Sequence, residues 1–532
     1  MTTTTVDATA PEPDASADRI WAPAAAFAGV AATAAALGVS ELVAGLLGAQ
    51  SLVAAVGGVV IDNQPPGAKD FVVSLFGTND KVALEVLIVV VALAIGAGIG
   101  LLARRWYTVA AAAIAGFAVV GFIAALGNPS VSAAPQALVA GAGAIAGVWT
   151  LSWLIGRAPT EGPSTAAAPG ALGMPNWSRR GFLIRSGSIA AASVVAGVVG
   201  RNMLEGAQAA PSTGGTTIPP PAQPATLPSG AELQEDGITP LVIPNDQFYR
   251  IDTALIAPSV DVTTWGLTIK GLVDRETTLS YADLAELPIV ERYVTIACVS
   301  NEVGGNLVGN AKWTGVRLRD VLEIAGVQPA ATQLVGRSVD GWTAGMPTAW
   351  VMDPAREPMV ALEMNDEPLS RAHGFPARLI VPGLYGYVSA TKWLSELELT
   401  TWEGFDGYWV PLGWSKEGPI LTQARIDVPS QGQTVPAGRV AIAGVAWAPD
   451  RGISRVEVAV DGEWREAQIS TPISDATWVQ WLYAWDAAAS GPGDHAIEVR
   501  ATDGTGEVQT DAVTPPAPDG ARGHHRISVR VA

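Results

Sequence analysis

The sequence predicts a membrane-spanning helical region of about five spans, followed by an α+β domain and a C-terminal immunoglobulin-like β-sandwich. Three observations lead to this fold class. Long apolar runs are confined to roughly the first 205 residues, short strand-like and helical segments alternate from about residue 240, and strict apolar–polar alternation begins near 421. The 532 residues are enough for two to four domains. Charged residues make up 15% of them and hydrophobic residues 49%, which is a more apolar composition than soluble proteins usually have.

Five apolar runs in the N-terminal region approach the roughly 20 residues that a membrane-spanning helix needs. They are residues 22–49, 82–103, 107–126, 136–156 and 182–200. The run 51–61 is too short to span, and we expect it to be re-entrant or interfacial together with 66–77. The sequence therefore predicts a disordered polar tail (1–20), a four-span membrane domain (21–160) and a fifth span that serves as an anchor (176–204).

Arginines between the apolar runs indicate the orientation in the membrane. Two lie between the second and third runs, and four lie between the end of the fourth run and the first residues of the fifth, namely Arg104, Arg105, Arg157, Arg179, Arg180 and Arg185. Lysine and arginine favour the cytoplasmic side. Both groups therefore place the N-terminus in the cytoplasm and the chain after about residue 203 outside. The prediction is a multi-pass protein of the cell membrane, embedded in the lipid bilayer.

The fifth span opens on the hexapeptide Ser-Arg-Arg-Gly-Phe-Leu at 178–183. Paired arginines before an Ala- and Gly-rich apolar stretch are typical of a twin-arginine export signal. The alternative is a pair of ordinary positive-inside anchors. The twin-arginine route exports folded proteins, which suits a protein that acquires a cofactor in the cytoplasm, and we expect the segment to remain as an anchor.

The rest of the chain is an acidic body behind a Pro/Gly-rich linker at 205–238. Residues 211–532 carry 22 Lys and Arg against 39 Asp and Glu, which excludes a nucleic-acid-binding role because phosphate backbones attract positive charge. We expect an α+β domain over 239–420 and the sandwich over 421–532. In the sandwich, the alternating segments are 455–462, 495–503 and 525–531, separated by turn signals.

Cys298 is the only cysteine in the chain, and it stands between an apolar strand-like run and the turn Val-Ser-Asn-Glu-Val-Gly-Gly. A lone cysteine most often packs as a small hydrophobic side chain. At the end of a strand that enters a glycine-containing turn, the sulfur can instead face a cavity and bind a metal as a thiolate. The local sequence leaves both interpretations open.

Several long segments, in the same order, resemble the sulfite oxidase family of molybdopterin enzymes over roughly residues 240–531. They are NDQFYRID (245–252), WGLTIKG (265–271), TIACVSNEVGGNLVGNAKWTGVRLRDVL (295–322), SVDGWTAGMP (338–347), 361–394 and GVAWAPDRGISRVEVAVDG (444–462). The resemblance implies a molybdopterin-binding domain, a cofactor of molybdenum and molybdopterin, and a sandwich of the kind that mediates homodimers in relatives. It also implies that Cys298 is the thiolate ligand to molybdenum, because a soft anionic sulfur suits this kind of metal.

The resemblance further implies which side chains hold the pterin and its phosphate. They are Tyr249, Arg250, Asp340, His373, Arg378, Thr391 and Lys392. Arginine, lysine and hydroxyl groups are the donors that a phosphate prefers. Three of these residues also fit a purely structural role, since Arg378 could be a surface strand charge, Asp340 part of an ordinary turn and His373 a structural histidine.

The segments that would bind a dianionic substrate depart from the family's pattern. Arg250 matches one substrate-binding arginine, but Glu302 and Val303 stand where a second is expected, and 478–485 lacks a third. Trp402 replaces a tyrosine. Buried anions need paired positive charge. We therefore expect a substrate other than sulfite, in a catalytic pocket that Arg250 and Trp402 line beside the metal.

Taken together, the sequence predicts a membrane-anchored molybdopterin oxidoreductase that exchanges an oxygen atom with a small molecule on the extracytoplasmic side. All four histidines lie outside the apolar runs, and one cysteine cannot hold an iron–sulfur cluster. Electrons would therefore pass through a separate partner, a cytochrome or the quinone pool. The alternative is a non-enzymatic membrane scaffold or receptor that retains the fold.

Overall fold

The computed structural model describes residues 20–64, 75, 80–128, 131–159, 177–209, 217–222 and 224–532. The chain forms two compact units, residues 1–207 and 208–532, and each is described by itself. The predicted disordered tail lies outside the described residues, except for Ile20, as does all but one residue of the 66–77 segment.

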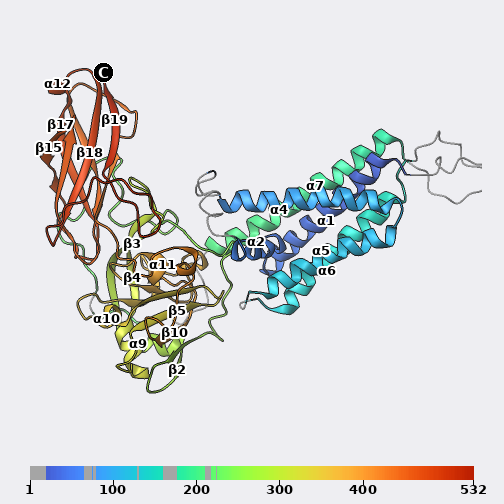
Figure 1. Cartoon of the computed structure of the whole chain (residues 1–532), viewed down its shortest axis with the longest axis horizontal. Coiled ribbons are helices and arrows are strands. Elements are labelled where there is room, and N and C mark those ends of the chain that lie inside the picture. The colour runs from blue at the N-terminus through green and yellow to red at the C-terminus, as the bar shows by residue number, and fades with distance from the viewer. Residues whose placement is uncertain are drawn as a thin grey trace, which may run out of the picture. The chain divides into compact units, whose positions relative to one another are not determined.

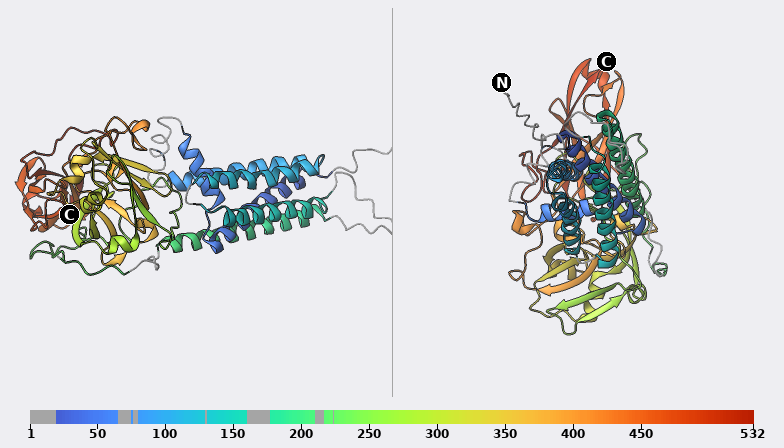
Figure 2. Two further views of the ribbon diagram at one scale, coloured as in Figure 1. Left: turned by 90° about the horizontal axis from the view of Figure 1, so that it is seen from below. Right: turned by 90° about the vertical axis from the view of Figure 1, so that its right-hand side faces the viewer.

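The first unit is a bundle of long apolar helices (Figures 1 and 2). Its helices are α1 (Ala22–Leu47), α2 (Leu52–Asp62), α4 (Asp80–Ala103), α5 (Tyr107–Leu126), α6 (Ala133–Ile155) and α7 (Arg179–Ala209). Among the described residues, five of these helices are long and apolar enough to cross a membrane, and α2 is the short one. The predicted number of spans is confirmed. The fifth helix is longer than the apolar run at 182–200, because it includes the arginine pair at its start and nine residues beyond that run.

Glycines let the helices of this unit approach one another closely. A Cβ at Gly100 of α4 would lie 1.9 Å from the Ala25 carbonyl oxygen of α1, and a Cβ at Gly29 would lie 1.9 Å from the Gly96 carbonyl oxygen. On another side of α1, a Cβ at Gly38 would lie 2.2 Å from the Ser193 oxygen of α7. Small residues at helix crossings allow the close backbone contact that stabilises helix pairs in lipid.

The second unit begins with an α+β domain built on two sheets. One sheet has the order β2–β1–β10–β5–β6 and the other the order β3–β4–β7–β8, with β9 paired to β7. The strands of the first are β1 (Gly266–Gly271), β2 (Thr277–Ser280), β5 (Gln333–Ser338), β6 (Thr343–Pro347) and β10 (Leu394–Thr400). Those of the second are β3 (Ile289–Ala297), β4 (Val308–Arg317), β7 (Met359–Met364), β8 (Glu367–Pro368) and β9 (Arg378–Ile380). Short helices connect them: α8 (Tyr281–Ala285), α9 (Leu318–Ala325), α10 (Thr348–Met352), η2 (Arg371–His373), α11 (Gly386–Ser389) and η3 (Val410–Leu412).

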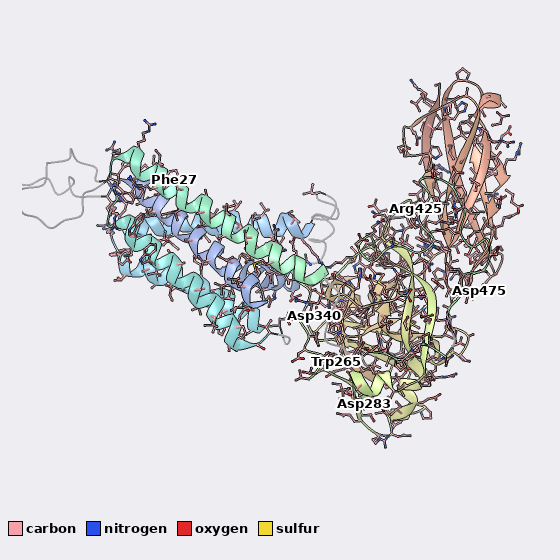
Figure 3. All side chains as sticks on the ribbon, turned by 180° about the vertical axis from the view of Figure 1, so that it is seen from behind. Phe27, Trp265, Asp283, Asp340, Arg425 and Asp475 are labelled. Atoms are coloured by element: carbon pink, nitrogen blue, oxygen red, sulfur yellow. The ribbon has the colours of Figure 1, made fainter. Side chains whose placement is uncertain are left out.

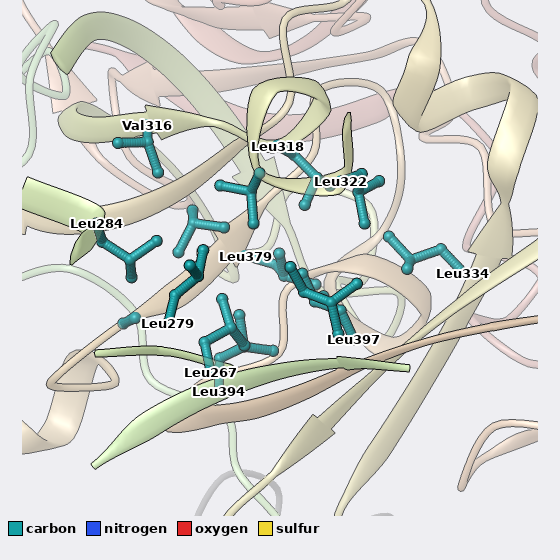
Figure 4. Close-up of a cluster of buried hydrophobic side chains, with 14 of the residues drawn as sticks. Leu267, Leu279, Leu284, Val316, Leu318, Leu322, Leu334, Leu379, Leu394 and Leu397 are labelled. Atoms are coloured by element: carbon teal, nitrogen blue, oxygen red, sulfur yellow. The ribbon is translucent and has the colours of Figure 1, made fainter. Parts of the chain in front are cut away.

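The core of this domain is a cluster of leucines and valines (Figure 4). The helix α9 buries Leu318, Val321, Leu322 and Ala325, which is the i, i+3, i+4, i+7 spacing of one helix face. Strand β1 buries Leu267 and Ile269, which are two residues apart, as alternation in a strand requires. The two periodicities direct both elements into one core.

The C-terminal domain is the predicted two-sheet sandwich. One sheet contains β11 (Gln423–Val428), β13 (Arg439–Trp447), β17 (Val479–Asp486) and β16 (Gln468–Ile469). The other contains β12 (Thr434–Val435), β19 (His525–Val531), β18 (Gly493–Asp503), β14 (Ile453–Val460) and β15 (Glu463–Glu466), and the short helix α12 spans Ala487–Ser490. The three predicted alternating segments correspond to β14, β18 and β19, and Trp481 and Trp485 lie in the core between the sheets.

Parts of the chain ahead of β1 pack against the body, beginning with Ile218. Ile218 joins the leucine-rich core, and Ala231 and Leu241 are buried in a separate cluster with Trp478. The backbone N–H of Ala225 donates to the Glu291 carboxylate at 3.0 Å. The described residues of the predicted linker therefore contribute buried side chains and a hydrogen bond to the body.

Candidate functional site

Cys298 lies immediately after β3, at the position the sequence predicts. Its backbone N–H donates to the Leu307 carbonyl oxygen at 2.9 Å, which closes the loop before β4 begins. The side chain is buried, with 8% of the residue exposed. The thiol therefore sits at the end of an antiparallel pair in which Ala297 faces Val308.

An aromatic group borders this end of β3. Phe248 stacks on Tyr249 with ring centroids 5.2 Å apart, and it meets the edges of Trp313 and His373 at 6.0 Å each. Burial raises the pKa of Tyr249 far above its usual range, and the nearby Cys298 thiol adds to the shift. Tyr249 is therefore a neutral hydrogen-bond donor close to the thiol.

Arg378 brings a buried positive charge to the same region. It is 3% exposed, its Nη1 donates to the His373 carbonyl oxygen at 3.1 Å, and its guanidinium lies 4.9 Å from the Trp313 ring centroid. Its Nε has no hydrogen-bond partner, and among the described residues no carboxylate pairs with it. Burial lowers the pKa of Arg378 to about 10, so the group is still charged at neutral pH. A surface strand charge is excluded by this position.

His373 is a neutral side chain with one open nitrogen. Its Nε2 donates to the Asn245 carbonyl oxygen at 2.7 Å, and its buried Nδ1 has no partner. Burial, together with the positive charge of Lys392, lowers the pKa of His373 to about 4. At neutral pH, Nδ1 is therefore an unprotonated acceptor that a ligand N–H or O–H could satisfy.

Lys392 and Arg250 share one carboxylate. Lys392 Nζ donates to Asp252 at 2.5 Å and to the Ala372 carbonyl oxygen at 3.1 Å, while Arg250 Nε donates to Asp252 at 2.7 Å. The Asp252 side chain is 2% exposed. Burial lowers the pKa of Lys392 to about 8 despite this partner. With Arg378, three cations thus lie near a single fully buried acid.

Asp340 lies in the turn between β5 and β6, and Thr391 lies just before β10. Asp340 accepts the Trp342 N–H at 3.1 Å in the turn between β5 and β6, and burial raises the pKa of its carboxyl, with Asp252 adding to the shift. Thr391 is fully buried, and its hydroxyl lies 3.5 Å from the Gly336 carbonyl oxygen. Asp340 therefore caps its own turn and also lies within electrostatic range of Asp252.

Trp402 lies apart from these residues. Its backbone N–H donates to Thr332 Oγ1 at 2.8 Å, and Lys416 Nζ lies 4.9 Å from its ring centroid. In the described part of the chain, these contacts join it to Thr332 and Lys416 and not to Cys298 or the buried cations. Its predicted place in the pocket is not supported by a direct contact.

Two side chains of the site were missed by sequence reasoning. Asp252 follows Arg250 by two residues, the spacing that puts both on one side of an extended segment, so the signal was present in the FYRID motif. Tyr385 lies near Cys298, and burial raises its pKa to about 12 with a further contribution from that thiol. Nothing in the sequence distinguishes Tyr385 from Tyr387, which points elsewhere and donates to the Ser415 carbonyl oxygen.

Comparison with known proteins gives two family matches. Residues 254–409 match the oxidoreductase molybdopterin binding domain, and residues 423–499 match a bacterial Ig domain. The chain is 31% identical over 335 residues to mitochondrial sulfite oxidase of Rattus norvegicus, covering 54% of this chain and 61% of that protein. It is 36% identical over 158 residues to the uncharacterized oxidoreductase YuiH of Bacillus subtilis (strain 168), covering 30% of this chain and 76% of that protein. The sulfane dehydrogenase SoxCD from Paracoccus pantotrophus gives a TM-score of 0.46 at 22% identity, over 58% of this chain and 86% of that one.

The residues of the site fit the cofactor that this family implies. Molybdopterin carries a phosphate and a pterin ring with both donors and acceptors. The unpartnered Arg378 Nε suits an anionic oxygen, and the unpartnered His373 Nδ1 suits a ring N–H. Cys298 supplies the one thiol that a soft metal would take.

The chain spans about three fifths of the mitochondrial sulfite oxidase it matches and about three quarters of the Bacillus oxidoreductase. The match to the molybdopterin binding domain lies on the α+β domain, and the bacterial Ig match lies on the sandwich that follows it. From these matches and the donor set around Cys298, the chain belongs to the sulfite oxidase family of molybdopterin-dependent oxidoreductases.

Proposed function

We propose that this oxidoreductase is anchored in the cytoplasmic membrane and transfers an oxygen atom to or from a small molecule on the extracytoplasmic side. The observation that carries the proposal is the position of Cys298. The only thiol of the chain follows a buried strand near Tyr249, and Tyr249 lies near Arg378 and stacks on Phe248, which meets the His373 ring. Cys298, Arg378 and His373 belong to the domain that matches molybdopterin-binding proteins. When bound, a molybdenum held by molybdopterin supplies two-electron oxygen-atom transfer.

Each side chain has a definable role toward the cofactor. Cys298 would hold the metal as a thiolate, the form of the side chain that a soft metal binds. Arg378 and Lys392 hold anionic oxygens, and Thr391 adds a hydroxyl donor. His373 accepts a hydrogen bond at Nδ1, while Tyr249, whose pKa is raised by burial, remains protonated and donates one.

The charges around the site favour a neutral or singly charged substrate. Arg250, the arginine that matches a substrate-binding position, is already paired with Asp252 at 2.7 Å. Glu302 adds an acid to the loop after Cys298. A dianion such as sulfite would have to compete with these carboxylates for positive charge. Sulfoxides, N-oxides and small monoanions are the substrate classes that this arrangement suits.

Electron transfer requires a partner. The chain has one cysteine and four histidines, all outside the five apolar helices, so those helices lack the ligands of a bis-histidine haem. A separate cytochrome or the quinone pool would supply or accept the electrons.

We also propose that two copies of the chain associate through the sandwich as a homodimer.

Elemental analysis tests the metal site. Purified full-length protein should contain about one molybdenum per chain, and Cys298→Ser should lose more than nine tenths of it, because the hydroxyl is a hard, weakly acidic ligand. Thr510→Ser, a substitution at an exposed residue of the sandwich, is the control and should retain its molybdenum. A wild-type protein free of molybdenum would support the non-enzymatic scaffold instead.

A screen of oxygen-atom donors and acceptors tests the substrate class on the loaded enzyme. We expect the highest kcat/KM with an uncharged sulfoxide or N-oxide or with a monoanion, and a value for sulfite at least a hundredfold lower, about 2.7 kcal/mol in transition-state stabilisation. Comparable turnover of sulfite would contradict the charge argument while leaving the metal site intact.

A further inference from the structure

The loop that follows Cys298 is closed on itself by backbone and side-chain hydrogen bonds. The Cys298 N–H donates to the Leu307 oxygen at 2.9 Å, and the Asn301 N–H donates to the Cys298 oxygen at 3.0 Å. Asn301 Oδ1 accepts the Leu307 N–H at 2.8 Å, and the Gly305 N–H donates to the Glu302 oxygen at 2.9 Å. Residues 298–307 are thus a compact unit, so a contact at the tip of the loop also restrains the cysteine at its base.

A buried arginine of the sandwich holds the tip of this loop. Arg425, on β11, donates from Nη1 to the Gly305 carbonyl oxygen at 2.9 Å (the residue is labelled in Figure 3). Its Nε donates to Asp427 at 2.6 Å and its Nη2 to Thr239 Oγ1 at 2.7 Å. The side chains of Arg425 and Asp427 are 10% and 8% exposed. All three guanidinium nitrogens are engaged, which fixes the planar group in one orientation.

A histidine of the sandwich lies against the neighbouring residue of the loop. A Cβ at Gly304 would lie 2.4 Å from Cδ2 and Nε2 of His525, and Gly304 has a φ of +78°. The His525 ring is oriented by the Ile426 N–H, which donates to Nδ1 at 3.0 Å. Only glycine leaves room for the ring and adopts this backbone conformation without strain.

The sandwich also holds the strand that leads into the cysteine. Three residues before Cys298, the Thr295 N–H donates to the Ala476 oxygen at 2.9 Å, and Thr295 Oγ1 accepts the Trp478 N–H at 2.8 Å. Both Thr295 and Trp478 are fully buried. The polypeptide is therefore held by the second domain on each side of the thiol.

We infer that the immunoglobulin-like sandwich positions the Cys298 thiol, with Arg425 and His525 as the positioning residues for the loop after it. The inference rests on the proposed function, in which Cys298 is the metal ligand. Neither residue touches the cofactor site directly, and both act through Gly304 and Gly305. The sandwich is accordingly a part of the metal-binding machinery and not only a surface for association between subunits.

Alkylation of the metal-free, full-length protein by iodoacetamide tests this inference. Since Cys298 is the only cysteine, the mass of the whole chain reports that one thiol. Arg425→Met should raise the alkylation rate roughly tenfold, because the loop loses a hydrogen bond from a charged donor and opens more often. The matched control is Arg451→Met, which removes another sandwich arginine, one that binds Asp503 at 2.8 Å and the Ile420 oxygen at 3.0 Å. A rate for Arg425→Met no higher than that for Arg451→Met would overturn the inference.

Gly304→Ala gives a second route to the same answer if Arg425→Met fails to fold. The added methyl group displaces the loop from His525 without removing any charge, and the alkylation rate should again rise several-fold above wild type. An unchanged rate would overturn the role of His525.

Molybdenum content distinguishes failure of the positioning role from failure of the proposed metal site. Faster alkylation in a protein that never binds molybdenum supports the positioning role and refutes the metal proposal, whereas equal rates in a protein that does bind molybdenum refute the positioning role alone.

Discussion

At the scale of single residues, burial determines the chemistry of this site more than pairing does. The pKa of Arg378 falls to about 10 and that of His373 to about 4, in each case chiefly because desolvation disfavours the charged form. Each group also keeps one nitrogen without a partner in the described structure. A folded chain tolerates such groups when a ligand completes their hydrogen bonds.

Arg378 should therefore contribute to cofactor retention at the expense of stability. We expect Arg378→Met to lose most of its molybdenum, while the free energy of unfolding of the metal-free protein rises by about 1–3 kcal/mol, since a buried charge without a carboxylate partner is removed. Chemical denaturation and elemental analysis measure the two effects. Arg292→Met is the control, because Arg292 binds Glu357 through two nitrogens, at 2.5 and 2.7 Å, and its loss should lower stability. A loss of stability in Arg378→Met as well would contradict this account.

Lys392 should make cofactor retention sensitive to pH. Its pKa is lowered from 10.5 to about 8, so above pH 8 the folded protein loses a proton that the unfolded chain keeps up to about 10.5. Raising the pH through this window should stabilise the metal-free protein, because the unfolded state then binds more protons, yet it should weaken retention of an anionic cofactor. Molybdenum content after dialysis at pH 7 and pH 9 tests the point. Lys392→Arg should flatten the profile, and parallel losses in both proteins would refute it.

At the scale of secondary-structure elements, glycines decide how closely neighbouring segments pack. On α4, Gly100 lies against the α1 backbone, whereas a Cβ at Gly98, two residues earlier, would meet nothing within 4 Å. In the body, a Cβ at Gly315 of β4 would lie 2.1 Å from the Val360 oxygen of β7. The sequence shows many glycines in these segments, but only the packed structure shows which of them lie at a crossing.

Gly98 and Gly100 form a matched pair for testing the helix crossing. Gly100→Leu should separate α1 from α4 and destabilise the membrane unit by roughly 1–3 kcal/mol, because the side chain has no room. Gly98→Leu should leave the midpoint of thermal unfolding in detergent unchanged or slightly raised, because leucine has a higher helix propensity than glycine. Equal midpoints for the two variants would show that the crossing is not tightly packed.

At the scale of the whole molecule, the chain combines an apolar helical unit with an acidic body of known enzyme family. Among the described residues, five helices have the length and hydropathy of membrane spans, and arginines cluster between α4 and α5 and from the end of α6 to the start of α7. The positive-inside rule predicts that the loop between α4 and α5 is cytoplasmic and that the body lies outside.

Single-cysteine labelling in intact cells tests that orientation. In a Cys298→Ser background, Ala512→Cys in the sandwich should react with a membrane-impermeant maleimide, and Trp106→Cys between α4 and α5 should react only after the cells are permeabilised. Both positions are exposed within their own units, so burial does not limit labelling. The opposite pattern would invert the predicted topology.

The sequence by itself determined the order and type of the domains, because apolar runs of about 20 residues, alternating strands and long family-like motifs are local patterns that survive in any packing. It also indicated Cys298, Arg378, His373 and Lys392 as candidates for one site. What only the tertiary structure decided is which of those residues meet and what surrounds them. Asp252 pairs with both Arg250 and Lys392, Trp402 lies in another loop, and Arg425 reaches the cysteine loop from 120 residues away. Burial and long-range hydrogen bonds set these relationships, and neither is encoded in the spacing of residues along the chain.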